Sequence, residues 1–341
     1  MRSFLPAVET TGPSRCPSQA EAHISPRCDT IKWKQPEITV YFINSCPCCA
    51  STQLQKWPAI VAPFIAHYAC GVEPQACCLC ECRSCTFRFF DSRLTDSEIG
   101  TLYAGYRGPA YFESRHRHEF WYSANVNAGI GNDGAEVTSR KQNLAKLLSG
   151  RSGSITSVLD YGGDRGQFIP DHLGTERYVF EISDATPVPG VKRIESVERR
   201  QFDFVMLAHV LEHCSEPLKV VDELKQLAND QTMYYFEVPY ERPSLRFAPQ
   251  GRLQRLYRDA LLRAGPLLTA VDFYSTVCRV KFNCNLPLGL LKCSEHLNFF
   301  NEKSLRALLE RRGYELMECG TAHTESQGPV NRILYGLARI A

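Results

Sequence analysis

A glycine-rich loop lies near the middle of the chain, directly after an apolar stretch. It reads Asp160-Tyr161-Gly162-Gly163-Asp164-Arg165-Gly166, and Glu181 follows 21 positions after Asp160. Glycines let the chain turn tightly and let a ligand approach the bare backbone. An acid at the end of the next strand can accept hydrogen bonds from both ribose hydroxyls of a nucleoside cofactor. The combination predicts a nucleoside-cofactor site, and the alternative is an ordinary turn between a strand and a helix.

The acids around this loop indicate which cofactor it would hold. A dinucleotide site has the pattern G-x-G-x-x-G and binds a pyrophosphate at a helix N-terminus. Here Asp160 precedes the first glycine by two residues and Asp164 lies inside the loop. Two carboxylates would repel a pyrophosphate, whereas they would attract the sulfonium and ammonium groups of S-adenosylmethionine. The charges therefore favour S-adenosylmethionine over NAD.

Histidines form a second group with chemical potential. His209-Val210-Leu211-Glu212-His213 fits the H-x-x-E-H pattern of some zinc peptidases, but it follows an apolar strand directly and no third ligand is evident. Three interpretations stay open: a brace for the sheet and the loop, a catalytic base or orienting group, and a metal site. His209 lies at the carboxyl end of a strand, where such sheets meet their ligands. His296 is a second candidate base, because imidazole titrates near neutral pH.

Cysteines form the third group. The chain has 16, and nine of them fall between Cys46 and Cys85. Two C-x-x-C pairs, Cys46 with Cys49 and Cys82 with Cys85, are separated by 32 residues, and four thiolates at such spacing can close a tetrahedral zinc site. Disulfides or unligated thiols are the alternative, but no export signal is present. Five neighbouring cysteines leave the choice of ligands open: Cys48, Cys70, Cys77, Cys78 and Cys80.

Apolar strands that alternate with helices position these groups. Short strands are expected at 157–160, 177–181, 202–207 and 232–238, with late strands at 315–319 and 332–338. Helices are expected at 95–103, where Thr95 and Glu98 have capping-box spacing, and at 135–148, 216–228 and 304–312. Near-continuous apolar strands of this kind indicate a parallel sheet that is covered on both faces. The fold class is therefore α/β.

Three stretches in this order resemble class I S-adenosylmethionine-dependent methyltransferases. They are the motif from Val158 to Gly166, the segment from Phe202 to Pro217 of "FD-V---HVLEH---P" type, and the ending "EH-NFF---SL" from Glu295 to Leu305. The resemblance covers about residues 150–341, with Asp164 in place of the family's usual central glycine. It implies a Rossmann-like, seven-stranded, mostly parallel sheet in which 332–338 is reversed. It implies catalytic roles for His209, His213 and His296. It implies cofactor binding by Asp160, Gly162, Gly163, Gly166, Glu181 and Leu207.

The resemblance extends to the metal question in two places. The cysteine cluster resembles the N-terminal zinc-ribbon-like region of some sugar C-methyltransferases, which implies Cys46, Cys49, Cys82 and Cys85 as zinc ligands. Ala50 and Thr86 replace the glycine that usually follows each pair. In some ubiquinone-pathway O-methyltransferases the segment matching His209, Glu212 and His213 is thought to bind a divalent ion. The expected organisation is a poorly ordered leader (1–36), a cysteine-rich zinc-binding segment (37–92), a helical and aromatic connector (93–149) and a methyltransferase domain (150–341) with a helical insertion (240–292).

The expected function is methyl transfer from S-adenosylmethionine to a small-molecule acceptor, such as a nucleotide sugar or polysaccharide precursor. The alternative is a zinc-ribbon binding module whose methyltransferase-like domain is inactive. In the insertion, Arg252, Arg255, Arg258 and Arg263 share a helix with leucines, which fits a lid over an acidic acceptor, a membrane-surface helix or a solvated face. The net charge of +2 gives no electrostatic case for nucleic acid. No apolar run of spanning length and no signal peptide are seen, so a cytoplasmic location is expected.

Overall fold

The computed structural model describes residues 41–151, 154–246, 248, 250–282, 284–325 and 331–341. The leader expected over residues 1–36 lies outside the described residues. All described residues belong to one compact unit, Ile38–Ala341.

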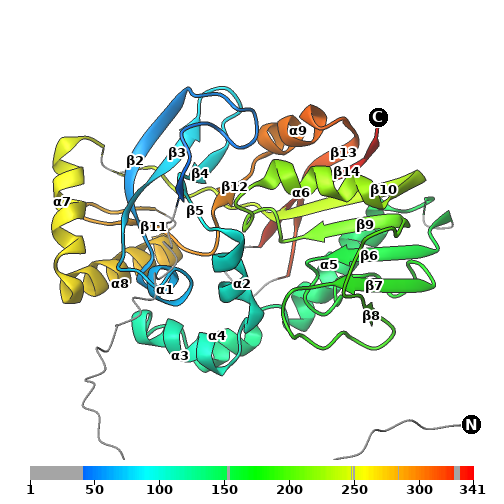
Figure 1. The fold of residues 1–341 in the computed structure, drawn as a ribbon, viewed down its shortest axis with the longest axis horizontal. Helices are drawn as coiled ribbons and strands as arrows, with labels where there is room; N and C mark the ends of the chain where they lie inside the picture. The colour runs from blue at the N-terminus through cyan, green and yellow to red at the C-terminus, as the bar shows by residue number, and fades with distance from the viewer. Residues whose placement is uncertain (1–40, 152–153, 247, 249, 283, 326–330) are drawn as a thin grey trace, which may run out of the picture. The chain divides into compact units, whose positions relative to one another are not determined.

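A seven-stranded sheet carries the glycine loop and the histidines (Figure 1). Its strand order is β13-β14-β10-β9-β6-β7-β8. The run from β10 to β8 pairs in parallel, while β14 is antiparallel to both of its neighbours. The α/β class and the mostly parallel sheet predicted from the sequence are confirmed. The strands are β6 (Ser157–Tyr161), β7 (Glu176–Phe180), β8 (Lys192–Arg193), β9 (Phe202–Ala208), β10 (Ala228–Pro239), β13 (Tyr314–His323) and β14 (Arg332–Ile340).

A second sheet contains the cysteine-rich segment, in the order β11-β2-β3-β4-β12. Two of these strands come from far along the chain, so the segment expected to end at residue 92 does not form a sheet by itself. A short pair, β1 with β5, brings the two ends of the cysteine-rich segment together. The elements are β1 (Tyr41–Phe42), β2 (Leu54–Val61), α1 (Pro63–Tyr68), β3 (Ala76–Cys82), β4 (Arg88–Phe90), β5 (Ser92–Arg93), β11 (Leu291–Cys293) and β12 (Asn298–Phe299).

Four helices connect the two sheets: α2 (Asp96–Ala104), α3 (Pro109–His118), α4 (Ala124–Gly129) and α5 (Gly134–Leu147). The predicted capping box is present at the start of α2. The Thr95 side chain accepts from the Glu98 backbone N–H, and the Glu98 carboxylate accepts from the backbone N–H of Thr95. These reciprocal bonds satisfy two of the donors that a helix start leaves free.

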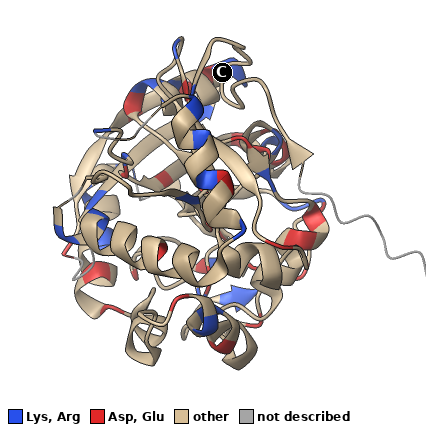
Figure 2. Cartoon of the chain, turned by 90° about the vertical axis from the view of Figure 1, so that its left-hand side faces the viewer, with Lys and Arg blue, Asp and Glu red and all other residues tan. Residues whose placement is uncertain are grey.

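The insertion consists mainly of α7 (Arg252–Leu262) and α8 (Gly265–Phe282), at the left edge of Figure 1. Helix α7 packs on the second sheet: Leu261 is buried with Ile60 of β2, and Arg258 donates to the Cys77 carbonyl of β3. Figure 2 views the molecule from the side on which these helices lie. In the part of the chain that the structure describes, no helix has both the length and the apolar character needed to cross a membrane.

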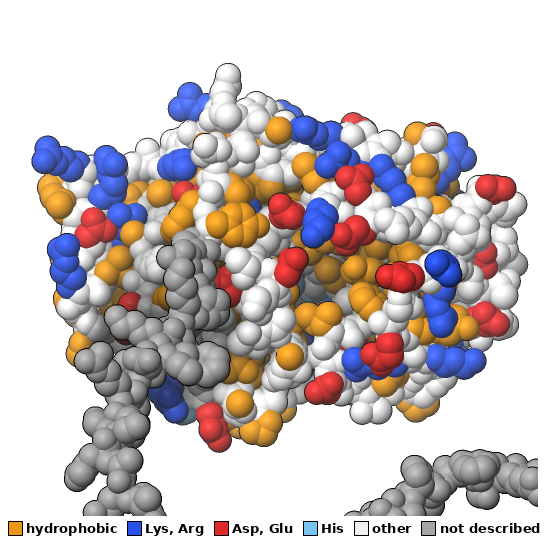
Figure 3. Space-filling view, viewed as in Figure 1, with side chains coloured by type: hydrophobic (Ala, Val, Ile, Leu, Met, Phe, Trp, Pro, Cys, Tyr) orange, Lys and Arg blue, Asp and Glu red, His pale blue; other side chains and the backbone are white. Residues whose placement is uncertain are grey.

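The surface seen in the view of Figure 1 has a mixed character. Lysine, arginine and acidic side chains are interspersed with apolar ones across most of this face (Figure 3). Blue side chains gather along the left edge, where Figure 1 places α7. The left edge therefore carries several positive side chains, while other lysines and arginines are spread over the rest of this face.

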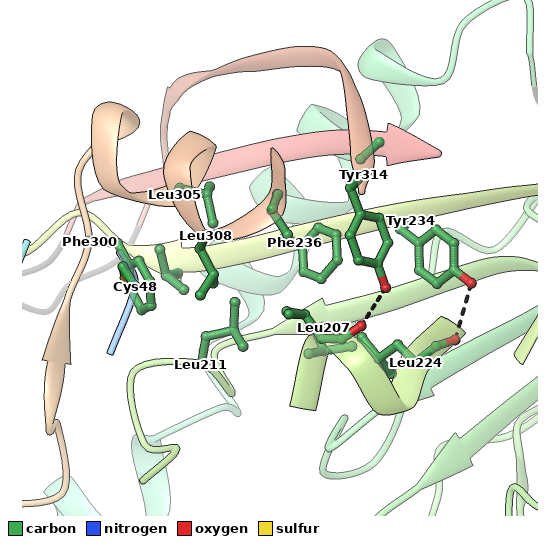
Figure 4. Packing of buried hydrophobic residues seen from close by; sticks show 14 of the residues in the cluster. Cys48, Leu207, Leu211, Leu224, Tyr234, Phe236, Phe300, Leu305, Leu308 and Tyr314 are labelled. Carbon is green, nitrogen blue, oxygen red and sulfur yellow. Dashed lines mark hydrogen bonds between the residues drawn. The ribbon is translucent and has the colours of Figure 1, made fainter. Parts of the chain in front are cut away.

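Alternating side chains of the seven-stranded sheet enter two separate cores. Leu207 and Phe236 face a core covered by α6 (Pro217–Glu223) and α9 (Glu302–Arg311), as Figure 4 shows, whereas Met206 and Tyr235 face a second core. Tyr234 donates to the Leu224 carbonyl, so its buried hydroxyl is satisfied. The helix expected over 216–228 is shorter than predicted: it continues as a 3-10 turn (Leu224–Leu227), and Ala228 already pairs with Phe202.

Candidate functional site

A cavity of about 1780 Å³ lies at the carboxyl ends of β6, β7, β9 and β10. In open α/β sheets this edge is where ligands bind. At one end, here called the loop end, the wall includes Gly162, Gly163, Asp164 and Glu181. The opposite wall, here called the histidine end, includes His209, His213 and His296. The structure thus brings the predicted glycine loop and all three predicted histidines to one cavity.

The glycines of the loop are required by space and by backbone conformation. Gly162 has φ 69°, and a Cβ there would lie 2.7 Å from Val210. A Cβ on Gly163 would lie 2.1 Å from the Asp160 carboxyl carbon. Gly166 has φ 68° and faces Val191 rather than the cavity, so its role in this structure is to shape the turn.

Asp160 lies directly behind Gly163 and is fully buried. Neither of its oxygens has a hydrogen-bond partner among the described residues. Burial raises the pKa of this carboxyl to about 8, although the nearby Arg140 guanidinium acts in the opposite direction. An unpaired buried carboxyl costs free energy that a bound cation would offset. The loop end is therefore suited to a positively charged ligand group.

Glu181 follows the carboxyl end of β7 and holds the glycine loop. One carboxylate oxygen accepts from the backbone N–H of Asp164 at 2.9 Å, and the other accepts from that of Ser183 at 2.9 Å. Each oxygen keeps a lone pair that a ribose hydroxyl can use. Leu207 differs from its expected position: its side chain is buried in the core, and the next two residues, Ala208 and His209, line the cavity in its place.

Asp164 occupies the position where the resemblance expects a glycine, and its backbone has the left-handed φ of 54°. Its side chain contacts Arg107 of the connector at 3.3 Å and accepts from Gln167 at 3.2 Å. Arg107 also donates to the Ile130 carbonyl at 2.7 Å. The acid is thus paired within the protein rather than free to meet a cofactor amine. No signal in the sequence pointed to Arg107, which lies 57 positions before Asp164.

His213 is the histidine best placed to accept a proton. Its Nδ1 lies 2.9 Å from the Tyr103 hydroxyl and 3.0 Å from the Glu295 carbonyl. Because a carbonyl only accepts, this network assigns the ring proton to Nδ1 and leaves Nε2 without one. Burial lowers the pKa of His213 to about 4, and the positive charge of His296 acts in the same direction. The ring is therefore neutral near pH 7.

His296 has the opposite character. Its Nδ1 lies 2.7 Å from a Glu241 carboxylate oxygen, and its ring packs edge-on against His213 at 4.8 Å. Burial alone would lower its pKa, but Glu241, with smaller contributions from Glu212 and Glu295, outweighs burial and raises the pKa to about 9. His296 is therefore an imidazolium near pH 7. It is a better proton donor than proton acceptor, which differs from its predicted role as a base.

His209 and Glu212 complete the histidine end. The His209 backbone has φ 60°, and its Nε2 lies 3.4 Å from a carboxylate oxygen of Glu237, which also forms a buried ion pair with Arg140. Glu212 is buried with no hydrogen-bond partner for either oxygen in the described part, and burial raises its pKa to about 8. Glu212, His213 and His296 bring one ligand-type atom each within 4.8 Å of one another. The divalent-ion interpretation of this motif stays a prediction.

A buried charge network borders the far wall of the cavity. Lys292 donates to Glu119 at 2.6 Å and to Asp272 of α8 at 2.9 Å, and all three side chains are buried. The Lys292 ammonium also lies 5.5 Å from the ring centre of Trp121. This network fixes the insertion against the connector. Spacing alone could not reveal it, because its members are far apart in the sequence.

The four predicted zinc ligands converge at the start of the second sheet. The sulfurs of Cys46 and Cys85 are 3.6 Å apart, those of Cys49 and Cys82 are 3.5 Å apart, and all four lie within 4.8 Å of one another. In a tetrahedral site with Zn–S bonds of about 2.3 Å, the sulfurs are about 3.8 Å apart. Burial acts to raise the pKa of Cys82, but backbone N–H groups of Cys85 and Ser84 lower it to about 7. The donor set and its spacing fit a zinc ion.

The turns after the two cysteine pairs are alike. The Ala50 N–H donates to the Cys46 carbonyl at 2.8 Å, and the Thr86 N–H donates to the Cys82 carbonyl at 2.9 Å. Ala50 has φ 58° and Thr86 has φ 59°, the left-handed region that glycine adopts without strain. The two substitutions that depart from the expected pattern thus keep the glycine-like backbone. The Thr86 carbonyl and hydroxyl also contact Asn301, the N-cap of α9.

Comparison with known proteins identifies the family. The sequence profile described as "Methyltransferase domain" matches residues 135–318. No curated protein sequence matches. Among solved structures, a methyltransferase of Burkholderia thailandensis that acts on 1,6-didemethyltoxoflavin is 15% identical with a TM-score of 0.40, over 69% of this chain and 91% of that chain. Magnesium protoporphyrin IX methyltransferase from Synechocystis is 16% identical with a TM-score of 0.40, over 69% and 97%.

Mitomycin 7-O-methyltransferase is 15% identical with a TM-score of 0.34, and the alignment covers 67% of this chain and 60% of that one. The chain thus spans less than two thirds of the length of that protein. The profile, by contrast, matches more than half of this chain and includes the glycine loop, Glu181 and all three cavity histidines. The prediction of a methyltransferase is confirmed, and the chain belongs to the methyltransferase domain family.

Proposed function

We propose that the cavity binds S-adenosylmethionine at the loop end and a small-molecule acceptor at the histidine end. The single observation that carries this proposal is the composition of one continuous wall. It joins Gly162, Gly163 and Glu181 to the neutral His213. A methyl donor and a proton acceptor in one cavity are what methyl transfer to a hydroxyl or an acidic carbon needs.

The loop end supplies the donor site. S-adenosylmethionine, when bound, supplies a methyl group on a positively charged sulfur. Glu181 would accept hydrogen bonds from the ribose hydroxyls, and the bare backbone of Gly162 and Gly163 allows the close approach. Behind them, the unpaired Asp160 carboxyl favours positive charge in this part of the cavity.

The histidine end would prepare the acceptor. Nε2 of His213 would take the proton that the acceptor loses when it receives the methyl group. Tyr103 and the Glu295 carbonyl hold the ring through its other nitrogen. His296, kept protonated by Glu241, would donate a hydrogen bond to an acceptor oxygen. The positioning of two reactants can contribute about 7–11 kcal/mol toward the barrier.

The acceptor class that fits best is a polyhydroxylated molecule such as a sugar derivative. Trp121 offers an aromatic face beside the paired charges of Lys292 and Glu119. Aromatic faces with fixed polar groups bind sugar rings. For the cysteine cluster we propose a structural zinc ion held by Cys46, Cys49, Cys82 and Cys85.

Isothermal titration with S-adenosylmethionine and with its demethylated product tests the donor site directly. We expect both to bind, and Glu181→Ala to weaken the affinity at least tenfold, because the ribose contacts are lost. Glu176→Ala, an exposed acid at the start of the same strand, is the matched control. The absence of binding by a folded protein would reject the enzyme and favour an inactive methyltransferase-like domain.

A further inference from the structure

The insertion exposes apolar side chains to an unusual degree. In the described part of the chain, 14 large apolar side chains are exposed, and eight of them lie between Leu253 and Leu288. Leu253 is 83% exposed, Phe282 63% and Leu288 68%. Single exposed apolar residues are normal, but a concentration of them marks a surface that contacts something other than water.

The exposed leucines of α7 do not lie on the face with which this helix packs on the second sheet. The helix buries Arg258 and Leu261 against β2 and β3. Leu253 and Leu256 lie three positions apart on the exposed side, where Leu256 is 59% exposed. A helix that needed only a solvated outer face would carry polar residues at these positions.

The charges around these residues have one sign. The exposed side chains of Arg252, Arg255 and Arg263, with Arg279 and Lys281 on α8, form no ion pair within the described ranges. The acids of the two helices form ion pairs with other residues: Asp259 pairs with Arg258, and Asp272 pairs with Lys292. Helix α8 follows α7 directly and contacts it, and both lie on the part of the molecule that Figure 2 presents. Positive side chains at this edge are visible in Figure 3.

We propose that the exposed surface of α7 and α8, defined by Leu253, Leu256, Val280 and Phe282 with the five cations above, docks on an anionic lipid bilayer. Arginines attract the negative headgroups while leucine and phenylalanine enter the boundary of the acyl chains. A protein partner of equal apolar character would not need five unpaired cations of one sign. Thr276, Arg279 and Val280 of α8 also line the cavity, so docking would place the cavity mouth at the membrane.

Sedimentation of the full-length protein with lipid vesicles tests this surface without relying on methyl transfer. We expect binding to vesicles that contain about one third phosphatidylglycerol and no binding to pure phosphatidylcholine vesicles. The variant Leu253→Ser with Arg255→Glu should lower the partition coefficient about tenfold or more. Both side chains are exposed, and circular dichroism checks that the variant keeps its fold.

The matched control makes the same two changes elsewhere, at Met317→Ser with Arg311→Glu, which are also exposed. It should sediment with anionic vesicles as the unmodified protein does. Equal loss in both variants, or no binding by the unmodified chain, would overturn the proposal. A dimer in light scattering that only the α7 variant dissociates, without vesicle binding, would overturn it in favour of a second copy of the chain. Because cofactor titration is independent of vesicles, failure here leaves the proposed methyl transfer unaffected.

Discussion

Arg107 of the connector and Asp164 of the glycine loop form an ion pair with 3.3 Å between Nη1 and Oδ2. The same guanidinium donates to the Ile130 carbonyl and lies 4.4 Å from the ring centre of Tyr106. The pair ties a loop that would contact the cofactor to helices that also line the cavity. Asp164 therefore holds the loop against the connector at the cavity wall, which gives a structural role to an acid where a glycine is usual.

Arg107→Ala should weaken S-adenosylmethionine binding about threefold to tenfold, because the loop loses a partly buried anchor. Isothermal titration measures the change, and Arg117→Ala, an exposed arginine on α3, should leave the affinity unchanged. In a double-mutant cycle, Arg107→Ala combined with Asp164→Asn should cost less than the sum of the two single changes. Strict additivity would mean that the ion pair does not support the loop.

The sequence predicted the features that short-range signals encode. Thr95 and Glu98 identified the start of α2. Near-continuous apolar runs, separated by helical stretches, identified β6, β7, β9 and β10. The four zinc-ligand candidates followed from the C-x-x-C spacing of the cysteines in each of two turns, and the structure places their sulfurs together. These signals work because the residues that form each signal, such as the two cysteines of one pair, lie within one turn or one strand of each other.

The remaining features depend on contacts between distant residues. Glu241 and His296 are 55 positions apart, and their pairing reverses the protonation expected of His296. Strands β11 and β12 have three and two residues, too few for a periodic pattern, so their membership of the second sheet could not be predicted. The prediction that Leu207 lines the cofactor site was off by one residue. The register of β9 decides which of its side chains reaches the cavity edge and which enters the core.

The cysteine cluster should copurify with about one equivalent of zinc, which metal analysis of protein produced without added metal can measure. Cys82→Ser should lose the metal and lower the melting temperature, because the site loses one of its four ligands and the ion would no longer join the two turns. Cys214→Ser, outside the four-cysteine cluster, should keep the zinc. Less than half an equivalent in the unmodified protein would contradict the assignment.

Binding of the cofactor should release a proton through Asp160. Its pKa of about 8 means that the free carboxyl is mostly protonated at pH 7. A nearby sulfonium or ammonium group favours the ionised form, so the pKa falls on binding and a proton leaves. Titrations at pH 7 in buffers of different ionisation enthalpy should show release of close to one proton. The affinity should rise between pH 6 and 8, since a deprotonated Asp160 then no longer has to lose a proton.

Asp160→Asn keeps the size of the side chain and removes the titration, so proton release should disappear. Its affinity should become insensitive to pH over the same range. Release of a full proton by this variant would assign the effect to another group and would leave Asp160 without an electrostatic role.

His213→Asn should lower methyl transfer about 100-fold or more, which is the usual contribution of a general base. The asparagine amide can still donate to the Glu295 carbonyl, but nothing replaces Nε2. Transfer of a radiolabelled methyl group into acceptors of a cell extract provides the readout, and cofactor affinity should change less than twofold. Activity near that of the unmodified protein would exclude His213 as the base.

Glu241→Gln should lower the pKa of His296 from about 9 by one unit or more, because Glu241 supplies the charge that outweighs burial. The direction of the pKa shift follows from the charges of the pair. A carboxylate stabilises the imidazolium, and a neutral amide of the same shape does not. Titration of the His296 ring by nuclear magnetic resonance measures the shift directly. If protonated His296 assists the acceptor, the alkaline limb of the methyl-transfer profile moves to lower pH in parallel. A shifted His296 pKa with an unchanged profile would show that its proton is not used in the reaction.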